Sequence, residues 1–378
     1  MNMLSPYWIP VFDRLSKKGW NIRVFVANEL ESGRQYDRAS MTPTFFEVRK
    51  TASYTIRIPR LVGRAGYVHF QYGLWQELKA WQPDIVLSNE VGFRTIFCFL
   101  YGLRMRIPVI PWLCASIHTE RNNGFLREGL RKWILARVPC VCTNLSEGTE
   151  YLVKGLGVSK TKIFQTPNVI DVTEFNEKIL SLKEQTRDLR EQLGLKGTVF
   201  LYVGQMIPRK GLSELARGIA AVDKDLLRGS SFLFVGGRLP NDIKSLLMKH
   251  RVLFSEVPFV QPRDLPRYYA LSDVFMFPSL EDEWGIVLNE AAASGLPIVA
   301  SKFAASAADL VEENVNGFVI DPHEPRQVAA AIGKFAAMSR ETLGRFGSAS
   351  LLRVQSVDIG FTLVNLHRAL LFAQDVTR

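Results

Sequence analysis

Cysteine is scarce in this chain of 378 residues, with four in total, at positions 98, 114, 140 and 142. Cys140 and Cys142 stand two apart, and neither a CxxC pair nor a cluster of histidines lies beside them. This spacing is not that of a zinc site or a disulfide framework, so we expect reduced thiols packed in a core. Few, reduced cysteines are typical of a cytoplasmic protein.

Long hydrophobic runs are also missing. The most apolar stretch, residues 96–113, is interrupted by two arginines and two prolines, so it is not one membrane-spanning helix. The first 19 residues contain Pro6, Pro10 and Asp13 where a signal peptide would need an apolar core. We therefore expect a protein that is cytoplasmic, either soluble or peripheral on the inner face of the membrane.

Glycine and proline, with 27 and 18 residues, are close to average usage, and hydrophobic residues make up 47% of the chain. This composition excludes a mainly disordered, collagen-like or low-complexity protein, and the length is about that of two domains. Acidic residues are fewer than basic ones, 37 against 47. The net charge of +10 suits an anionic partner, such as lipid headgroups, nucleic acid or a phosphate-bearing substrate, or else serves solubility alone.

Short apolar runs alternate with amphipathic stretches along the chain. This alternation predicts parallel sheets with helices on both faces. In the first half the pattern predicts strands at 22–27, 84–88, 107–112 and 138–143, and helices at 6–18, 67–81, 93–103, 125–136 and 146–154. In the second half it predicts strands at 199–203, 232–235, 274–277 and 297–300, and helices at 211–222, 241–250, 264–270, 286–293 and 325–335.

The alternation of strands and helices stops near residue 167. The stretch 173–196 is polar, with one helical patch at 188–193. We therefore predict two doubly wound α/β domains, 1–167 and 168–345, and a C-terminal helical segment at 346–378 that crosses back to the first domain. A doubly wound domain normally opens with a strand, whereas here a helix follows the first Met. Either the first strand is absent from this reading frame, or the true start lies upstream, or the sheet has one strand fewer.

A basic loop follows the strand predicted at 199–203. Its sequence, Gly204-Gln205-Met206-Ile207-Pro208-Arg209-Lys210-Gly211, offers two cations at the carboxyl end of a strand, where open α/β sheets bind ligands. Arg209 gives a planar fork and Lys210 a compact charge, a pair that suits a diphosphate. The spacing is neither that of a P-loop nor that of a dinucleotide-binding GxGxxG. The alternative interpretation is a solvated basic turn.

An acidic segment, Glu281-Asp282-Glu283-Trp284-Gly285, precedes the helix predicted at 286–293. The free N–H groups of Trp284, Gly285 and Ile286 would point toward an anion, and Gly285 would permit close approach of a ligand. Asp282 and Glu290 are eight residues apart, so we expect both near one face of the helix, holding hydroxyls of two parts of a ligand. The alternative is that Asp282 caps the helix and Glu290 lies at the surface.

With these two segments, the second half of the chain resembles the C-terminal domain of the retaining GT-B glycosyltransferases of family 4, the glycosyl transferases group 1. The likeness is strong over residues 198–325 and weaker at Asn168-Val169-Ile170-Asp171, which is similar to the family's interdomain PN-x-D. Residues 5–12, SPYWIPVF, are similar to the opening of its polysaccharide-assembly members. The other matching motifs are Tyr202-Val203-Gly204, Arg209-Lys210-Gly211, Val235-Gly236-Gly237, Phe259-Val260, Tyr269-Ala270, Ser272-Asp273-Val274-Phe275, Pro278-Ser279 and 284–301.

The resemblance implies a GT-B fold, in which two Rossmann-like domains face each other across a cleft, with the acceptor on 1–167 and the nucleotide-sugar on 168–345. It implies that Arg209 and Lys210, in the loop that begins at Gly204, bind the donor diphosphate. It also implies contacts of Asp282 with the donor sugar, of Glu290 with the ribose, and of the backbone at Trp284, Gly285 and Ile286 with the phosphates. The chain departs from the family pattern at Gln205, where Arg is frequent, and at Asp282, which replaces Glu.

The reaction implied is transfer of a hexose from a nucleotide-diphosphate sugar to a hydroxyl of a glycan or lipid-linked acceptor, with retention, in polysaccharide or glycolipid assembly. The sequence has no DxD-like acidic pair in a donor loop, so we expect neither a metal nor a cofactor besides the donor substrate. The alternatives are a nucleotide-sugar epimerase or phosphorylase of the same architecture, and a non-catalytic protein that binds membranes or nucleic acid. No helix-turn-helix or aromatic-interleaved basic run is present, so we expect no nucleic-acid partner.

Two features of the first half are further candidates. His118 follows the strand predicted at 107–112 and either orients acceptor or donor hydroxyls or is an ordinary surface histidine. A second feature is the basic amphipathic helix predicted at 125–136, which either lies on an anionic membrane or packs on its own domain with its charges in water. Its apolar and basic residues are Phe125, Leu126, Leu130, Trp133 and Ile134, with Arg127, Arg131, Lys132 and Arg137.

Overall fold

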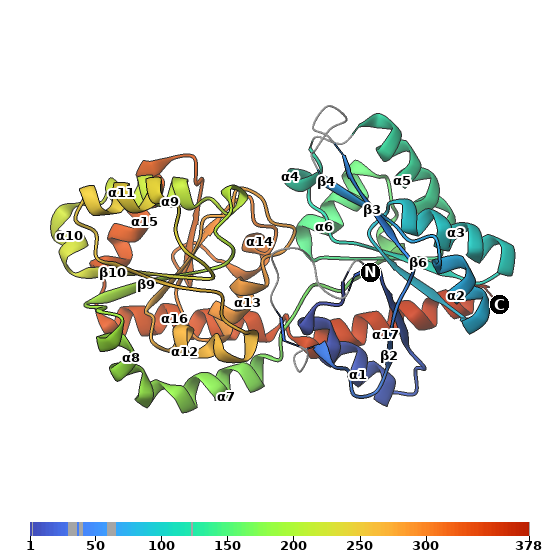
Figure 1. Cartoon of the computed structure of the whole chain (residues 1–378), viewed down its shortest axis with the longest axis horizontal. Coiled ribbons are helices and arrows are strands. Elements are labelled where there is room, and N and C mark those ends of the chain that lie inside the picture. Colours follow the sequence, from blue (N-terminus) through green and yellow to red (C-terminus); the bar gives the residue numbers. More distant parts are fainter. Residues whose placement is uncertain (2, 29–35, 38–40, 59–65, 122–123, 378) are drawn as a thin grey trace. The chain divides into compact units, whose positions relative to one another are not determined.

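The computed structural model describes residues 1, 3–28, 36–37, 41–58, 66–121 and 124–377. It divides into two compact units (Figure 1). Unit 1 comprises Met1–Val169 and Ile359–Arg378, and unit 2 comprises Ile170–Asp358. The segment that returns to unit 1 is shorter than the expected 346–378. Helix α16 (Arg340–Gln355) belongs to unit 2, and the last helix, α17 (Ile359–Thr377), belongs to unit 1.

Unit 2 contains a six-stranded sheet in the order β11-β10-β9-β12-β13-β14, with every neighbouring pair parallel. Its strands are β9 (Thr198–Val203), β10 (Ser230–Val235), β11 (Phe254–Val257), β12 (Val274–Phe277), β13 (Ile298–Ser301) and β14 (Gly317–Ile320). Four of the strands are buried at every residue, as a sheet covered on both faces requires: β9, β10, β12 and β13. The strand order reverses between β9 and β12, so the carboxyl ends of these two strands border the crevice where such folds bind ligands.

Helices cover both faces of this sheet. Phe200 and Phe232 face a core that is completed by α9 (Leu212–Ala220), α11 (Asn241–Lys249) and α15 (Pro325–Ala336). Phe275 points to the opposite face, where its ring lies 5.8 Å from that of Tyr269 in α12 (Pro266–Ala270). The same side carries α7 (Val172–Leu182) and α13 (Ile286–Ala293), which pack on one another and on α12 and α16.

The sequence prediction missed α7, which falls in the polar stretch at 173–196, and also missed β11 and β14. A local signal for α7 was present in the sequence. The side chain of Asp171 accepts a hydrogen bond of 3.0 Å from the Glu174 amide and so caps the helix. An Asp followed three residues later by Glu is a recognised helix start.

The parallel strands of unit 1 lie in two separate sheets. One has the order β5-β6-β7-β8, with β5 (Val86–Asn89), β6 (Val109–Leu113), β7 (Val141–Thr143) and β8 (Ile163–Gln165). The other pairs β1 (Arg23–Val26) with β2 (Glu47–Lys50). Within the described ranges, the first element is a 3-10 turn followed by α1 (Ile9–Lys17), and no strand precedes it.

The helix predicted at 67–81 is wrong in its first part. β4 (Gly66–Phe70) is a strand that pairs antiparallel with β3 (Tyr54–Ile58), and only α2 (Leu74–Trp81) is helical. The segment Tyr67-Val68-His69-Phe70 is rich in aromatic and β-branched residues, which favour strands once a partner strand is available. Pairing between distant residues therefore outweighed the helical periodicity.

None of the four cysteines, all of which lie among the described residues, forms a disulfide, and Cys98, Cys140 and Cys142 are buried in unit 1. Burial raises the pKa of the Cys140 thiol to about 12, so this thiol stays protonated at neutral pH. These thiols pack in the core, where a protonated sulfur behaves as a small apolar group.

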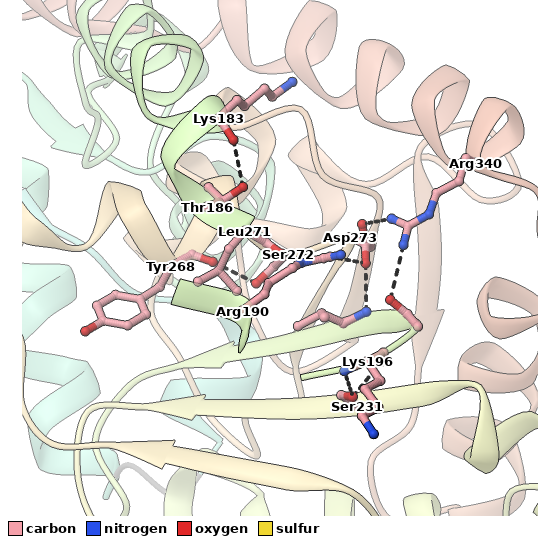
Figure 2. A network of polar contacts seen from close by, with 12 residues as sticks. Lys183, Thr186, Arg190, Lys196, Ser231, Tyr268, Leu271, Ser272, Asp273 and Arg340 are labelled. Atoms are coloured by element: carbon pink, nitrogen blue, oxygen red, sulfur yellow. Dashed lines mark hydrogen bonds and ion pairs between the residues drawn. The ribbon is translucent and has the colours of Figure 1, made fainter. Parts of the chain in front are cut away.

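A polar network ties the amino ends of β9 and β12 to neighbouring helices (Figure 2). The Asp273 carboxylate accepts hydrogen bonds from Arg340 in α16, from Arg190 in α8 (Thr186–Gln192) and, at 2.8 Å, from the Val199 amide. Arg190 also donates to the Leu271 carbonyl at 2.6 Å. The network lies at the edge opposite to the carboxyl ends of the strands, so we assign it a structural role.

Candidate functional site

Two loops meet at the carboxyl ends of β9 and β12. The Leu280 amide, after β12, donates a hydrogen bond of 2.9 Å to the carbonyl of Arg209, after β9. Gly211 has φ +71°, and a Cβ there would lie 2.0 Å from the Pro278 carbonyl oxygen. Only glycine allows this approach, so the sequence of the basic loop fixes its contact with the acidic loop.

Lys210 and Asp282 form an ion pair across these two loops. Their side chains are 13% and 14% exposed, so the pair sits at the rim of the crevice and is partly shielded from water. The Lys210 ammonium also lies 5.4 Å from the ring centroid of Phe277. The structure therefore brings together a cation and a carboxylate that the sequence analysis assigned separately, one to the diphosphate and one to the sugar.

The N-terminus of α13 faces the same loops and has no side-chain cap. Its N-cap is Gly285, with φ +88°, where a Cβ would lie 2.7 Å from the Phe277 ring. The N–H groups at the start of an uncapped helix form a site of positive potential that suits a phosphate. The Trp284 amide donates a hydrogen bond of 3.4 Å to the Asp282 carboxylate, and binding of an anion by the backbone at Trp284, Gly285 and Ile286 stays a prediction.

The predicted relation between the two acids is wrong. Helix α13 begins at Ile286, so Asp282 precedes it by four residues and lies on a loop, where it bridges to Ala304. Asp282 is therefore neither the helix cap nor two helical turns from Glu290. The cause is the left-handed Gly285, which turns the chain sharply before the helix starts.

Glu290 lies in the interior of unit 2, with 1% of its surface exposed. Its carboxylate accepts a hydrogen bond of 2.7 Å from the Tyr269 hydroxyl of α12. A buried carboxylate needs such partners, so the pair holds one charged oxygen in a fixed place. Sequence reasoning noted Tyr269 as part of a motif and gave it no role, because a contact over 21 positions leaves no local signal.

Arg209 and Gln205 complete the basic loop. The Arg209 side chain is exposed, and its guanidinium lies 3.4 Å from the Glu281 carbonyl oxygen. The Gln205 carbonyl accepts a hydrogen bond of 2.9 Å from the hydroxyl of Tyr202 in β9. Burial raises the pKa of Tyr202, so it remains a neutral donor and supports the loop just after Gly204.

His118 belongs to unit 1, whereas the other predicted site residues belong to unit 2. It lies half-buried in a short helix, α4 (Ile117–Glu120), rather than in a loop. Ser116 and Thr119 close a capping box at the start of this helix. The carboxylate of Glu120 pairs with Arg131 at 2.5 Å.

Neither a metal cluster nor a membrane-spanning helix is found in the part of the chain that the structure describes. No group of three or more His, Cys, Asp or Glu side chains there is arranged to hold a metal ion. No helix among the same residues combines the length and the apolar character that crossing a bilayer requires.

Most of the second unit matches a known family of protein domains. Residues 197–337 match the family model described as glycosyl transferases group 1. Residues 197–337 form a group 1 glycosyltransferase domain. The matched range runs from the residue before β9 to the residue after α15, so this domain contains the ion pair of Lys210 and Asp282, the N-terminus of α13 and Glu290.

Curated relatives with sequences similar to this chain include several glycosyltransferases. The UDP-Gal:alpha-D-GlcNAc-diphosphoundecaprenol alpha-1,3-galactosyltransferase of Escherichia coli is 29% identical over 269 residues, 66% of this chain and 65% of the relative. A D-inositol 3-phosphate glycosyltransferase of Xylanimonas cellulosilytica is 27% identical over 237 residues, 57% of this chain and 55% of the relative. The chain thus matches less than two thirds of the length of these relatives.

Solved structures extend the likeness to both units. HepE of Anabaena, in complex with UDP and glucose, superposes with a TM-score of 0.71 at 18% identity, over 97% of this chain and 96% of that one. WaaG, a glycosyltransferase involved in lipopolysaccharide biosynthesis, gives a TM-score of 0.68 at 17% identity, over 98% and 97%. The predicted fold class is confirmed: the group 1 domain is one of the two α/β domains of a GT-B fold.

Proposed function

We propose that this chain is a retaining hexosyltransferase that takes its sugar from a nucleotide-diphosphate donor. The main support for this proposal is the ion pair of Lys210 and Asp282, which lies beside the uncapped N-terminus of α13. Both lie where the strand order of the group 1 domain reverses. A cation and free N–H groups bind a diphosphate, and a carboxylate accepts hydrogen bonds from sugar hydroxyls. The titles of the HepE structures name UDP and UDP-glucose as bound molecules, which supports a donor of this kind.

The proposed mechanism depends on electrostatic stabilisation of the leaving diphosphate. When the bond to the sugar breaks, negative charge develops on the leaving diphosphate, and Lys210 and Arg209 stabilise it together with the amides of Gly285 and Ile286. The Lys210 ammonium has three donors, so a bound phosphate shares it with Asp282. The other oxygen of Asp282 accepts a hydrogen bond of 3.4 Å from the Trp284 amide, and its second lone pair can accept one from a hydroxyl of the donor sugar. These groups can carry the leaving-group charge without a metal ion.

Further contacts are proposed for the ends of the substrates. Glu290, held by Tyr269, accepts hydrogen bonds from the ribose, and the loop after Gly204 lies along the diphosphate. His118 orients a hydroxyl of the acceptor. The name of the E. coli relative specifies a lipid-linked diphosphate sugar as its acceptor, so we propose a glycan or lipid-linked acceptor here as well, in polysaccharide or glycolipid assembly.

Binding of donors tests this function first. A panel of uridine, guanosine and adenosine diphosphate sugars should contain at least one that raises the melting temperature. A ligand at 100 times its dissociation constant adds about 2.7 kcal/mol to the free energy of unfolding. The matching nucleoside diphosphate should stabilise the protein as well, and the nucleoside less. A panel in which no nucleotide or nucleotide-sugar changes the melting temperature would contradict the proposal.

We also propose that helix α5 (Phe125–Arg137) rests on an anionic membrane at the inner face. Phe125, Leu126 and Trp133 are 81%, 74% and 44% exposed, although they are large and apolar. Exposed basic residues alternate with them along the helix: Arg127, Lys132 and Arg137. Apolar side chains beside cations are typical of a helix that lies in a headgroup layer.

Arg131 faces neither water nor lipid, unlike the other basic residues that the sequence places on this amphipathic helix. This side chain is buried, pairs with Glu120 at 2.5 Å and donates to the Tyr151 hydroxyl at 3.0 Å. Burial by itself would lower the pKa of Arg131, but Glu120 outweighs it and raises the pKa above its usual value. Arg131 therefore fixes α5 to its own unit. The exposed basic residues are the other three, of which Lys132 pairs with Glu128 at 2.5 Å and Arg137 donates to the Trp133 carbonyl at 3.0 Å.

Flotation with phosphatidylglycerol vesicles tests the membrane proposal. The chain should float at low salt and be released at high salt, because exposed charges are screened. The double substitution Phe125→Ser and Leu126→Ser should abolish flotation. The matched control is Leu180→Ser with Leu352→Ser, two exposed leucines of unit 2. Equal flotation of both double variants would contradict a role for α5.

A further inference from the structure

The side chain of Trp284 is buried in unit 2, although this residue belongs to the acidic loop that precedes α13. It is 2% exposed. Its indole Nε1 donates a hydrogen bond of 2.9 Å to the Oδ1 of Asn289 in α13. This bond spans the left-handed turn at Gly285. A side-chain contact therefore joins the acidic loop to the helix on the far side of the turn.

Asn289 is a polar residue inside a mainly apolar helix, whose sequence is Ile-Val-Leu-Asn-Glu-Ala-Ala-Ala. It is fully buried. Its Oδ1 accepts the bond from Trp284, whereas its Nδ2 is buried and has no partner among the residues that the structure describes. A buried amide group without a partner costs free energy that a leucine of similar size would not cost. The acceptor that Asn289 offers to the indole is a reason for this cost.

The backbone of Trp284 is held as well. Its carbonyl accepts a hydrogen bond of 3.2 Å from the amide of Ser306 and another from the hydroxyl of the same residue, which is buried after β13. Its amide donates to the Asp282 carboxylate at 3.4 Å. With the indole and the carbonyl both fixed, the direction of this amide is fixed too.

The main chain of Asp282 is joined to the segment that contains Ser306. The Asp282 amide donates a hydrogen bond of 3.2 Å to the Phe303 carbonyl, and the Asp282 carbonyl accepts one of 3.1 Å from the Ala305 amide. The carboxylate itself contacts Lys210 and the Trp284 amide. A bound phosphate would share Lys210, so the Trp284 amide is the contact that keeps its full strength when the donor binds.

We propose that Trp284 and Asn289 are positioning residues for the transfer of the sugar. Asn289 fixes the indole of Trp284, and Trp284 presents its amide to the Asp282 carboxylate, which therefore keeps its direction while the donor sugar binds. Both residues act through Asp282 rather than on the donor itself, so the inference rests on the proposed role of Asp282. A displacement of about 1 Å at a reacting centre is enough to slow a reaction strongly. Loss of the bond should therefore slow turnover more than it weakens nucleotide binding.

Three variants test the pair. Trp284→Phe removes the N–H donor and keeps an aromatic ring, Asn289→Leu removes the acceptor at similar size, and the double variant removes both. The matched control is Trp112→Phe in β6, because the buried indole Nε1 of Trp112 has no partner within the described ranges. Asp282→Asn is measured beside them.

The assay follows release of the nucleoside diphosphate from the best donor of the panel, with water as the acceptor. Titration with the same nucleoside diphosphate gives the affinity, and thermal unfolding gives the melting temperature. Each single variant should lower kcat by about 10- to 100-fold and keep the affinity within about 3-fold of the parent's value. Trp112→Phe should keep the kcat of the parent. The double variant should regain the melting temperature that Asn289→Leu loses, because no unpaired group is left, and should remain slow.

Two results would overturn this inference alone. One is the parent's kcat in both single variants while Asp282→Asn is slow. The other is a double variant that regains kcat together with its melting temperature, because the bond would then serve stability only. The parent's kcat in Asp282→Asn would instead overturn the proposed role of Asp282, and this inference with it.

Discussion

An ion pair joins Lys210 and Asp282, although 72 positions separate them in the chain. One follows β9 and the other follows β12, the two strands between which the order of the sheet reverses. The fold thus brings together the cation that we propose for the diphosphate and the carboxylate that we propose for the sugar, and each of the two roles leads to a different prediction.

Lys210→Ala should weaken binding of both the nucleoside diphosphate and the nucleotide-sugar. A hydrogen bond to a charged group is worth about 1.5–3 kcal/mol, so we expect a loss in affinity of roughly 10- to 100-fold. Isothermal titration with the nucleoside diphosphate measures it. The control is Arg217→Ala, an exposed cation of α9 that pairs with Glu214. Unchanged affinity of Lys210→Ala would remove the diphosphate assignment.

Asp282→Asn should lower turnover strongly and nucleotide affinity only modestly. The substitution keeps size and most hydrogen-bonding capacity but removes the charge that holds sugar hydroxyls and Lys210. Asp282→Glu restores the family's length and should remain active, with an altered preference among donors. Steady-state assays with the best donor measure the turnover of both variants and of the parent protein. If Asp282→Asn transferred sugar at the parent's rate, the residue would be no more than a partner of Lys210.

Tyr269→Phe should show whether the carboxylate of Glu290 serves the nucleotide. Removal of the hydroxyl leaves a buried carboxylate with one hydrogen bond fewer, so the free energy of unfolding should fall by about 1–3 kcal/mol. Nucleotide affinity should fall as well, and Glu290→Gln should lower it further because ribose hydroxyls donate best to a charged acceptor. The neighbouring Tyr268→Phe is the control. Affinity that stays at the parent's value in both Tyr269→Phe and Glu290→Gln would make this pair purely structural.

The buried Met1 amine should make the free energy of unfolding of this protein depend on pH. Its pKa is lowered to about 4 in the folded chain, by burial first and by Arg94 second, while Cys98 and Glu90 oppose the shift. Between that value and the ordinary pKa of an α-amine near 8, the unfolded chain binds the additional proton. The free energy of unfolding should therefore rise as the pH is raised through this window.

Urea unfolding at pH 5 and pH 8 measures the effect, and the difference from a chain extended by one alanine before Met1 isolates the amine. The extended chain has an amide in place of the Met1 amine, so its stability should change less between the two pH values. Equal changes in the two proteins would show that the amine is charged in the folded state as well.

The sequence allowed much of unit 2 to be predicted. Buried parallel strands such as β9 and β12 read as continuous apolar runs, and the glycines at 204, 211 and 285 mark sharp turns after them. What local patterns could not show are the contacts between distant residues. The pairing of β4 with β3, the burial of Arg131 against Glu120 and the bond from Tyr269 to Glu290 each depend on a partner supplied by another element.

The predicted geometry of the two acids failed for a related reason. A spacing of eight residues was interpreted as two turns of one helix, yet the left-handed Gly285 turns the chain between Asp282 and the helix. Both acids could be selected as candidates from the sequence, but their relation could not be predicted, because one residue with positive φ changes the direction of the chain that precedes it.

The most direct test of the central claim is the anomeric configuration of the product. The best donor of the panel, labelled with carbon-13 at the anomeric position of the hexose, is incubated with the protein and a glycan or lipid-linked acceptor. Nuclear magnetic resonance then follows the labelled carbon. We predict release of the nucleoside diphosphate and a glycoside with the configuration of the donor. A product of inverted configuration, or a donor that changes its sugar without releasing nucleoside diphosphate, would contradict the account.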